Sequence, residues 1–122
     1  MKSKLLSDDV FMVDVRAMTG AREDAQKYLE KIESDFEISE NALGICIRVP
    51  DGSLLLWLHD PSDFYVLLHE TTHLVRMVLV DCGVDVDLKY GDEVFAYYQM
   101  YWFRKLWRYY SSLMPKGGEN SD

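Results

Sequence analysis

The segment His69-Glu70-Thr71-Thr72-His73 sets two histidines and a glutamate at a spacing that suits metal chemistry. On a helix, residues four apart lie one turn apart on one face, about 6 Å in axial rise, so both imidazoles can aim at one ion. Glu70 then lies about 100° around the helix, beside the metal. In this pattern, HExxH, the imidazoles hold Zn²⁺ and the carboxylate takes a proton from the zinc-bound water, whose pKa the ion lowers toward about 7. The alternative is a core helix whose histidines are satisfied by hydrogen bonds.

The residues around the motif predict the helix that must carry it. Residues 60–63, Asp-Pro-Ser-Asp, offer N-cap chemistry and a proline, so the helix should begin near Ser62 or Asp63. Gly83 offers its stop. Apolar residues between these points cover most of the circumference, which predicts a helix buried on nearly every side. Because unpaired polar groups there would cost several kcal/mol, a metal would satisfy all three motif side chains.

Glu93 is the expected third metal ligand. It follows His73 by 20 residues and lies at the start of a second helix predicted from about Asp92 to Leu113. A short loop after Gly83 would return this helix against the first one. The alternative role of Glu93 is that of a first-turn carboxylate favoured by the helix dipole.

With this glutamate, the chain resembles the gluzincins, the thermolysin-like superfamily in which a glutamate on the following helix completes HExxH. It is also similar to small HExxH proteins of bacteriophages and prophages, in which a glycine and then an acidic, aromatic helix of the form (N/D)-E-x-x-A-Y follow the motif. Residues 92–97 read Asp-Glu-Val-Phe-Ala-Tyr. The resemblance covers about Trp57 to Arg104, and only HExxH with the downstream glutamate is specific. It implies a zinc-dependent metallopeptidase in which His69, His73 and Glu93 bind Zn²⁺ and Glu70 is the general base.

Other branches of the zincins fit less well. The metzincin pattern needs a glycine and a histidine where this chain has Arg76 and Leu79, so that branch is excluded. A branch with an aspartate ligand uses D-x-x-Y-G, and residues 87–91 match this string. Asp87 follows His73 by 14 residues, further than that branch leads us to expect, and is therefore the alternative third ligand. It could also cap the turn into the second helix.

Peptide hydrolysis also needs a donor for the developing oxyanion, which tyrosine or histidine can supply. Tyr97 lies one turn beyond Glu93 on the same face and is the expected donor, with Tyr90 and Tyr98 as alternatives. His59 ends the strand before the motif helix and could point into the same cleft. Each of these side chains also has a purely structural interpretation, in packing or in solvent.

Composition limits the function. With 122 residues, 48% of them hydrophobic, the chain has enough apolar content for one core. Its net charge of −8 argues against nucleic acid as a partner, because phosphate binding relies on clustered lysine and arginine. The sequence contains neither a signal-peptide segment nor about 18 uncharged apolar residues in a row, so we expect no membrane association and a cytoplasmic protein, in the host cytoplasm if phage-encoded. Cys46 and Cys82 are expected to be buried, reduced thiols.

The predicted elements follow one another in an α+β order. An apolar run over residues 10–15 predicts a strand, and Thr19 to about Phe36 predicts an amphipathic helix. Leu43–Val49 and Ser53–Leu58 predict a hairpin around the turn Pro50-Asp51-Gly52. We therefore expect one zincin-like domain over residues 1–114, with a small, twisted, mostly antiparallel sheet on the motif helix, and a disordered tail over residues 115–122.

The resemblance also implies how a substrate would bind. In zincins the edge strand of the sheet lies over the cleft, and an extended peptide pairs with it. Here either hairpin strand, Leu43–Val49 or Ser53–Leu58, could be that edge. The chain is too short for a full second lobe, so the substrate is small or a partner completes the site.

The second helix carries aromatic residues on more than one face, because Tyr101, Trp102 and Phe103 are consecutive and point about 100° apart. One face must pack on the motif helix. A second, exposed face would mark an interface for a homo-oligomer or a protein partner, unless the helix over residues 19–36 covers it. The expected function is thus a peptidase acting on a peptide or protein. The alternatives are a zincin-fold interaction module, catalytically weak or inactive and phage-related, or an unrelated α+β domain with an accidental motif.

Overall fold

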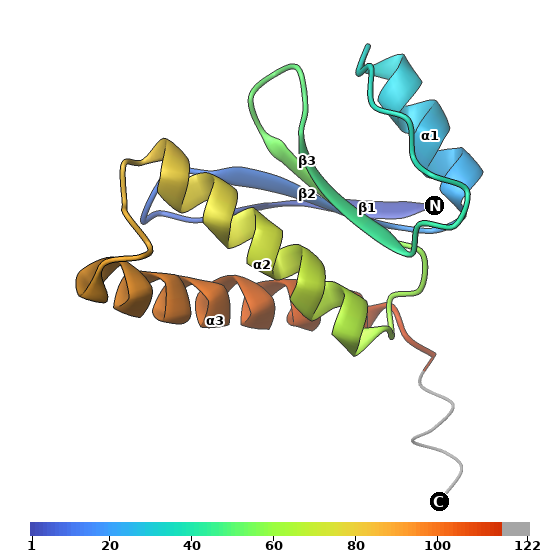
Figure 1. Ribbon diagram of the computed structural model, residues 1–122. Helices are drawn as coiled ribbons and strands as arrows, with labels where there is room; N and C mark the ends of the chain where they lie inside the picture. Colours follow the sequence, from blue (N-terminus) through green and yellow to red (C-terminus); the bar gives the residue numbers. More distant parts are fainter. Residues whose placement is uncertain (116–122) are drawn as a thin grey trace, which may run out of the picture.

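Four short strands form one sheet in the order β1-β2-β4-β3 in the computed structural model, which describes residues 1–115 (Figure 1). The strands are β1 (Lys2–Ser7), β2 (Asp14–Thr19), β3 (Gly44–Arg48) and β4 (Leu54–Leu58). β1 pairs antiparallel with β2 and β3 antiparallel with β4, whereas β2 and β4 are parallel. The predicted α+β class is confirmed, and the sheet is mixed because α1 leads from β2 to β3, and the antiparallel β3 then returns the chain so that β4 runs parallel to β2.

Helices cover both faces of this sheet. Helix α1 (Arg22–Lys31) packs on one face, and α2 (Phe64–Asp81) and α3 (Lys89–Ser112) pack on the other (Figure 1). Side chains alternate across the strands: Leu54, Leu56 and Leu58 of β4 join the core under α2 and α3, while Leu55 and Trp57 join the core under α1. Every residue of β4 is therefore buried.

The N-terminal region differs from the prediction. Residues 10–13 belong to the loop between β1 and β2, so the strand predicted over residues 10–15 is wrong except at its last two positions. Met12 has a φ of 57°, which interrupts extended backbone. Strand β1 was not predicted, because it is an exposed edge strand with only Leu6 buried and lacks a clear apolar period.

The next elements follow the sequence pattern more closely. Helix α1 ends earlier than predicted, and Glu33 just beyond it has a φ of 63°. Its predicted inner face is confirmed, since Ala25 and Leu29 are buried and Tyr28 and Ile32 pack beside them. The predicted hairpin of β3 and β4 is also confirmed.

Helix α2 has the predicted ends. The Asp63 side chain caps it by accepting a hydrogen bond from the Val66 amide at 3.1 Å. Gly83, with a φ of 77°, follows its last turn. The prediction that α2 is buried on nearly every side is wrong, however. One face is open to solvent and carries Tyr65, His69, His73, Arg76 and Val80.

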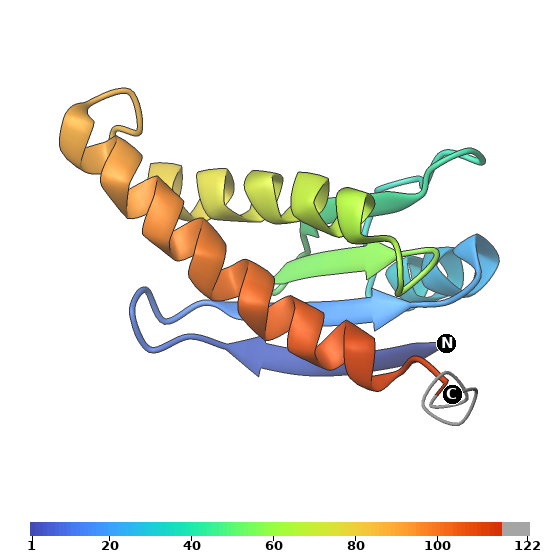
Figure 2. The ribbon, with the colours of Figure 1, turned by 90° about the horizontal axis from the view of Figure 1, so that it is seen from below.

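Helices α2 and α3 run antiparallel. Near the start of α2, the Phe64 ring lies 5.0 Å from the Phe103 ring, and further along α2 the Arg76 guanidinium lies 5.7 Å from the Phe95 ring. Figure 2 shows α2 on the β4–β3 side of the sheet and α3 crossing β2 and β1. Beyond Pro115, the tail predicted to be disordered lies outside the described residues. None of the helices in residues 1–115 combines the length and apolar character needed to cross a membrane.

Candidate functional site

His69 and His73 lie next to each other on the open face of α2. Their Nε2 atoms are 3.1 Å apart, and their rings are nearly perpendicular, at 84°. Two nitrogens bound to one tetrahedral zinc ion at about 2.05 Å would be separated by about 3.3 Å. The pair therefore already has the spacing of two ligands of one ion. Both side chains are exposed, so the alternative of core histidines is wrong with respect to burial. Its hydrogen-bonded part is not contradicted, because a separation of 3.1 Å is also that of a hydrogen bond between the two rings.

Glu70 faces the edge strand β3. The residue is only 7% exposed, and its neighbour across the gap is Gly44. A Cβ atom on Gly44 would lie 3.1 Å from Glu70 Cγ and 2.6 Å from Val66 Cγ1. Helix and strand therefore approach each other at a point where only glycine fits. Strand β3 is an edge of the sheet, whereas β4 is paired on both sides. Of the two hairpin strands that could have been the edge, it is therefore β3, which approaches the motif helix at Gly44.

The Glu70 carboxylate makes no hydrogen bond with the other described residues. Burial raises its pKa above the usual value, and the two nearby imidazoles partly oppose this shift. No hydrogen bond from the described residues stabilises its charge, and its oxygens are not fully enclosed. A buried carboxyl group with a raised pKa, no structural partner and access to solvent is typical of a functional site.

A cavity of about 440 Å³ lies beside the motif, between α2 and β3, and is lined in part by His73, Arg76 and Cys46. Cys46 is half-buried rather than fully buried, and burial raises the pKa of its thiol well above the usual range, so this thiol is protonated in the metal-free protein. Cys82 is exposed, contrary to the prediction of a buried thiol.

The structure does not bring Glu93 to the histidines. Gln99 is the α3 residue level with the motif, because its Nε2 donates to Thr72 Oγ1 at 2.7 Å. Glu93 lies six residues before Gln99 on the helix, about 9 Å along the axis, and lines a separate cavity. Helix α2 continues for eight residues beyond His73, but Glu93 lies only four residues after the start of α3. The chain has therefore not yet come back level with the motif when it reaches Glu93. The sequence spacing alone could not reveal this mismatch.

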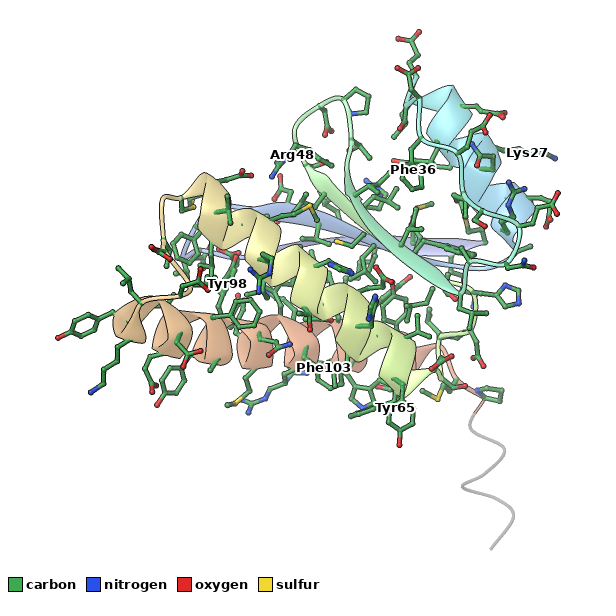
Figure 3. The ribbon with its side chains drawn as sticks, viewed as in Figure 1. Lys27, Phe36, Arg48, Tyr65, Tyr98 and Phe103 are labelled. Atoms are coloured by element: carbon green, nitrogen blue, oxygen red, sulfur yellow. The ribbon has the colours of Figure 1, made fainter. Side chains whose placement is uncertain are left out.

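The remaining candidates also lie elsewhere. Asp87 is exposed in the connection between α2 and α3. Tyr90 and Tyr97 are exposed and line the same cavity as Glu93. Tyr98 lies on the first half of α3 (Figure 3). Its hydroxyl donates a hydrogen bond to the buried Asp8 carboxylate. His59 follows β4 at the same end of the hairpin as Gly44, but its side chain lies near the Trp57 ring and lines a cavity on the α1 side of the sheet.

The residues present fit part of a zinc site. His69 and His73 supply two nitrogens at a suitable separation. Within residues 1–115, no group of three His, Cys, Asp or Glu side chains is arranged to hold a metal ion. Among the described residues, the predicted triad is thus reduced to a histidine pair with Glu70 beside it.

Two contributors to the site were missed in the sequence. Gly44 carries a recognisable signal, because a glycine inside a strand often marks close approach of another element. Gln99 carries none, since only the register of α3 on α2 places it beside Thr72. Comparison of the chain with protein-family models, with curated proteins and with solved structures finds no match.

Proposed function

We propose that this protein is a zinc-dependent peptidase in which His69 and His73 hold the metal and Glu70 is the general base. One observation carries the proposal: Glu70 is buried next to two convergent imidazoles, has a raised pKa and has no hydrogen-bond partner among the described residues. Such a carboxylate costs stability, and a catalytic role would explain its presence.

Each residue has a defined task in this proposal. Zinc, when bound, supplies Lewis-acid polarisation of the scissile carbonyl and acidifies water. Glu70 accepts the proton of the attacking water and passes it to the leaving amine, and its raised pKa suits both transfers. The exposed position of the histidines leaves the remaining coordination positions accessible to a substrate.

Strand β3 is the proposed substrate platform. Its outer edge is unpaired in the described sheet, and its first residue, Gly44, lies against Glu70. An extended peptide could add to this edge by main-chain hydrogen bonds, which would bring a peptide carbonyl close to the motif.

Two measurements test this function. The first is zinc binding by wild type and by His69→Ala, which should lose most of its affinity. The second is cleavage of a broad peptide library, followed by mass spectrometry, with wild type, Glu70→Gln and the exposed control Glu40→Gln. Products formed by wild type and Glu40→Gln but not by Glu70→Gln would support the peptidase. If wild type forms no product that Glu70→Gln fails to form, the peptidase proposal is refuted.

A second candidate is a zinc-binding interaction module without catalysis. The position of Glu93 favours it, because two histidines alone hold zinc less firmly than the three protein ligands usual in catalytic sites. In that case zinc binding would depend on His69, while no peptide in the library would be cleaved.

A further inference from the structure

A second surface of the molecule has the composition of a binding site. It is a cavity of about 540 Å³ between the β1–β2 loop and the first half of α3, which we call the tyrosine pocket. Its walls include four tyrosines of α3, one phenylalanine of the loop and a single charged residue, namely Tyr90, Tyr97, Tyr98, Tyr101, Phe11 and Glu93.

The pocket is uncovered. Tyr90 is 86% exposed and Tyr97 is 69% exposed. The prediction left open whether the first helix covers the second face of the aromatic helix, but α1 lies on the opposite face of the sheet (Figure 1). Met12 on the adjoining loop is 82% exposed and has a positive φ, a strained conformation for a residue with a side chain. Apolar surface displayed in this way marks an interaction site.

A buried hydrogen-bond network fixes the shape of the pocket. The Asp8 carboxylate accepts hydrogen bonds from the Phe11 amide at 2.7 Å, from the Tyr98 hydroxyl, and from Trp102 Nε1 at 3.2 Å. These bonds tie the loop to α3, and Phe11 and Tyr98 pack edge to face with centroids 5.0 Å apart. The pocket is thus formed before any ligand arrives, which lowers the entropy cost of binding.

A charge at the rim of the pocket favours a cationic ligand. The wall itself is apolar, and the exposed Glu93, which contributes only apolar atoms to it, is the only charged residue among the lining residues. Glu93 takes part in no ion pair within residues 1–115. Tyrosine faces attract cations through the ring quadrupole. The same row of rings already holds an ammonium group further along α3, where Lys105 Nζ lies 5.2 Å from the Tyr101 ring centre and 5.6 Å from that of Trp102. The net charge of −8 adds long-range attraction for a basic partner.

We propose that the tyrosine pocket binds a lysine side chain of a partner protein. The aliphatic part of the lysine lies against the tyrosine rings and Val94, and its ammonium group pairs with Glu93. A protein is the source of this lysine because two exposed loop residues, Val10 in the wall of the pocket and Met12 next to it, offer apolar contacts to residues that flank the lysine. This surface is separate from the histidine pair, so the proposal does not depend on the peptidase.

Two capped tripeptides of the sequences Leu-Lys-Leu and Leu-norleucine-Leu test the proposal, with choline as a third probe. Binding is measured by ¹H–¹⁵N NMR titration of the full chain. We expect the lysine peptide to bind with roughly millimolar affinity and to shift the amides of residues 9–13 and 90–101. The norleucine peptide, which lacks only the ammonium group, should bind about fivefold more weakly.

Matched variants locate the site. Glu93→Gln and Tyr97→Ala should each lower the affinity for the lysine peptide about fivefold. The control variants Glu40→Gln and Tyr65→Ala, at exposed positions on other surfaces, should leave this affinity unchanged. Equal binding of the two peptides, unchanged binding to Glu93→Gln, or the absence of shifts around the pocket would overturn the proposal. Choline binding more tightly than the lysine peptide would overturn the assignment to a protein partner.

Discussion

Gly44 of β3 and Glu70 of α2 lie in such close contact that a Cβ atom at position 44 would come within 3.1 Å of Glu70 Cγ. This contact holds the candidate general base against the free edge of the sheet. It also couples the candidate substrate platform to the motif helix, so a change in one displaces the other.

Gly44→Ala should lower the free energy of unfolding by about 1–3 kcal/mol, because the added methyl group must push Val66 and α2 away from β3. Urea denaturation measures this loss. In the double variant with Val66→Ala, the obstructing Cγ1 is gone, so the combined loss should be smaller than the sum of the single losses. Strict additivity would show that the two positions do not clash.

Zinc should stabilise the protein through the histidine pair. At a free zinc concentration 100 times the Kd, the gain is about 2.7 kcal/mol, or roughly 10 °C in Tm for a domain of this size. A chelator should reverse the shift. His69→Ala should abolish it, whereas His59→Ala, whose side chain lies on the α1 side of the sheet, should retain it. A variant without His69 that still responds like wild type would exclude the pair as the metal site.

Glu93→Gln should leave zinc affinity unchanged within about twofold, because Glu93 lies about 9 Å along α3 from the level of the motif. Isothermal titration calorimetry of wild type and variant decides this. A loss of tenfold or more would mean that α3 shifts on metal binding and that Glu93 does complete the site, as its spacing from His73 predicts.

Glu70→Gln should stabilise the zinc-free protein at neutral pH by on the order of 1 kcal/mol. Burial raises the pKa of Glu70 above the usual value of 4.5, so the folded state binds this proton more tightly than the unfolded state does. Wild type is therefore most favoured below pH 4.5 and loses stability as the pH rises through the folded-state pKa. Glutamine does not titrate, so the advantage of the variant should grow with pH. A difference independent of pH would contradict a raised pKa.

Asp8→Ala should lower the free energy of unfolding by about 3 kcal/mol or more, the largest loss among these variants. It leaves the Tyr98 hydroxyl, Trp102 Nε1 and the Phe11 amide without an acceptor in a buried place. Asp9→Ala, at an exposed position beside it, should cost less than about 0.5 kcal/mol. Thermal unfolding of both variants makes the comparison, and equal losses would show that the network contributes nothing.

Local signals predicted much of this fold. The Asp63 cap, the Gly83 stop and the turn ending at Gly52 depend on neighbours in the sequence, and each is confirmed. Errors arose where the outcome depends on distant contacts. The aromatic residues of α3 form one repeating pattern in the sequence, yet Tyr98 is buried and Tyr97 is exposed, because only one face of α3 meets the sheet and α2.

For the site, the sequence by itself determined the histidine pair and its glutamate, because residues 69–73 lie on one helix whose period sets their relative positions. Only the tertiary structure decided that the motif faces solvent, that β3 rather than β4 is the edge, and that Glu93 lies on another surface. These outcomes depend on where strands pair and on where α3 begins after the connection from α2. A shift of a few residues in that start moves Glu93 by several ångströms, a difference that spacing along the chain does not encode.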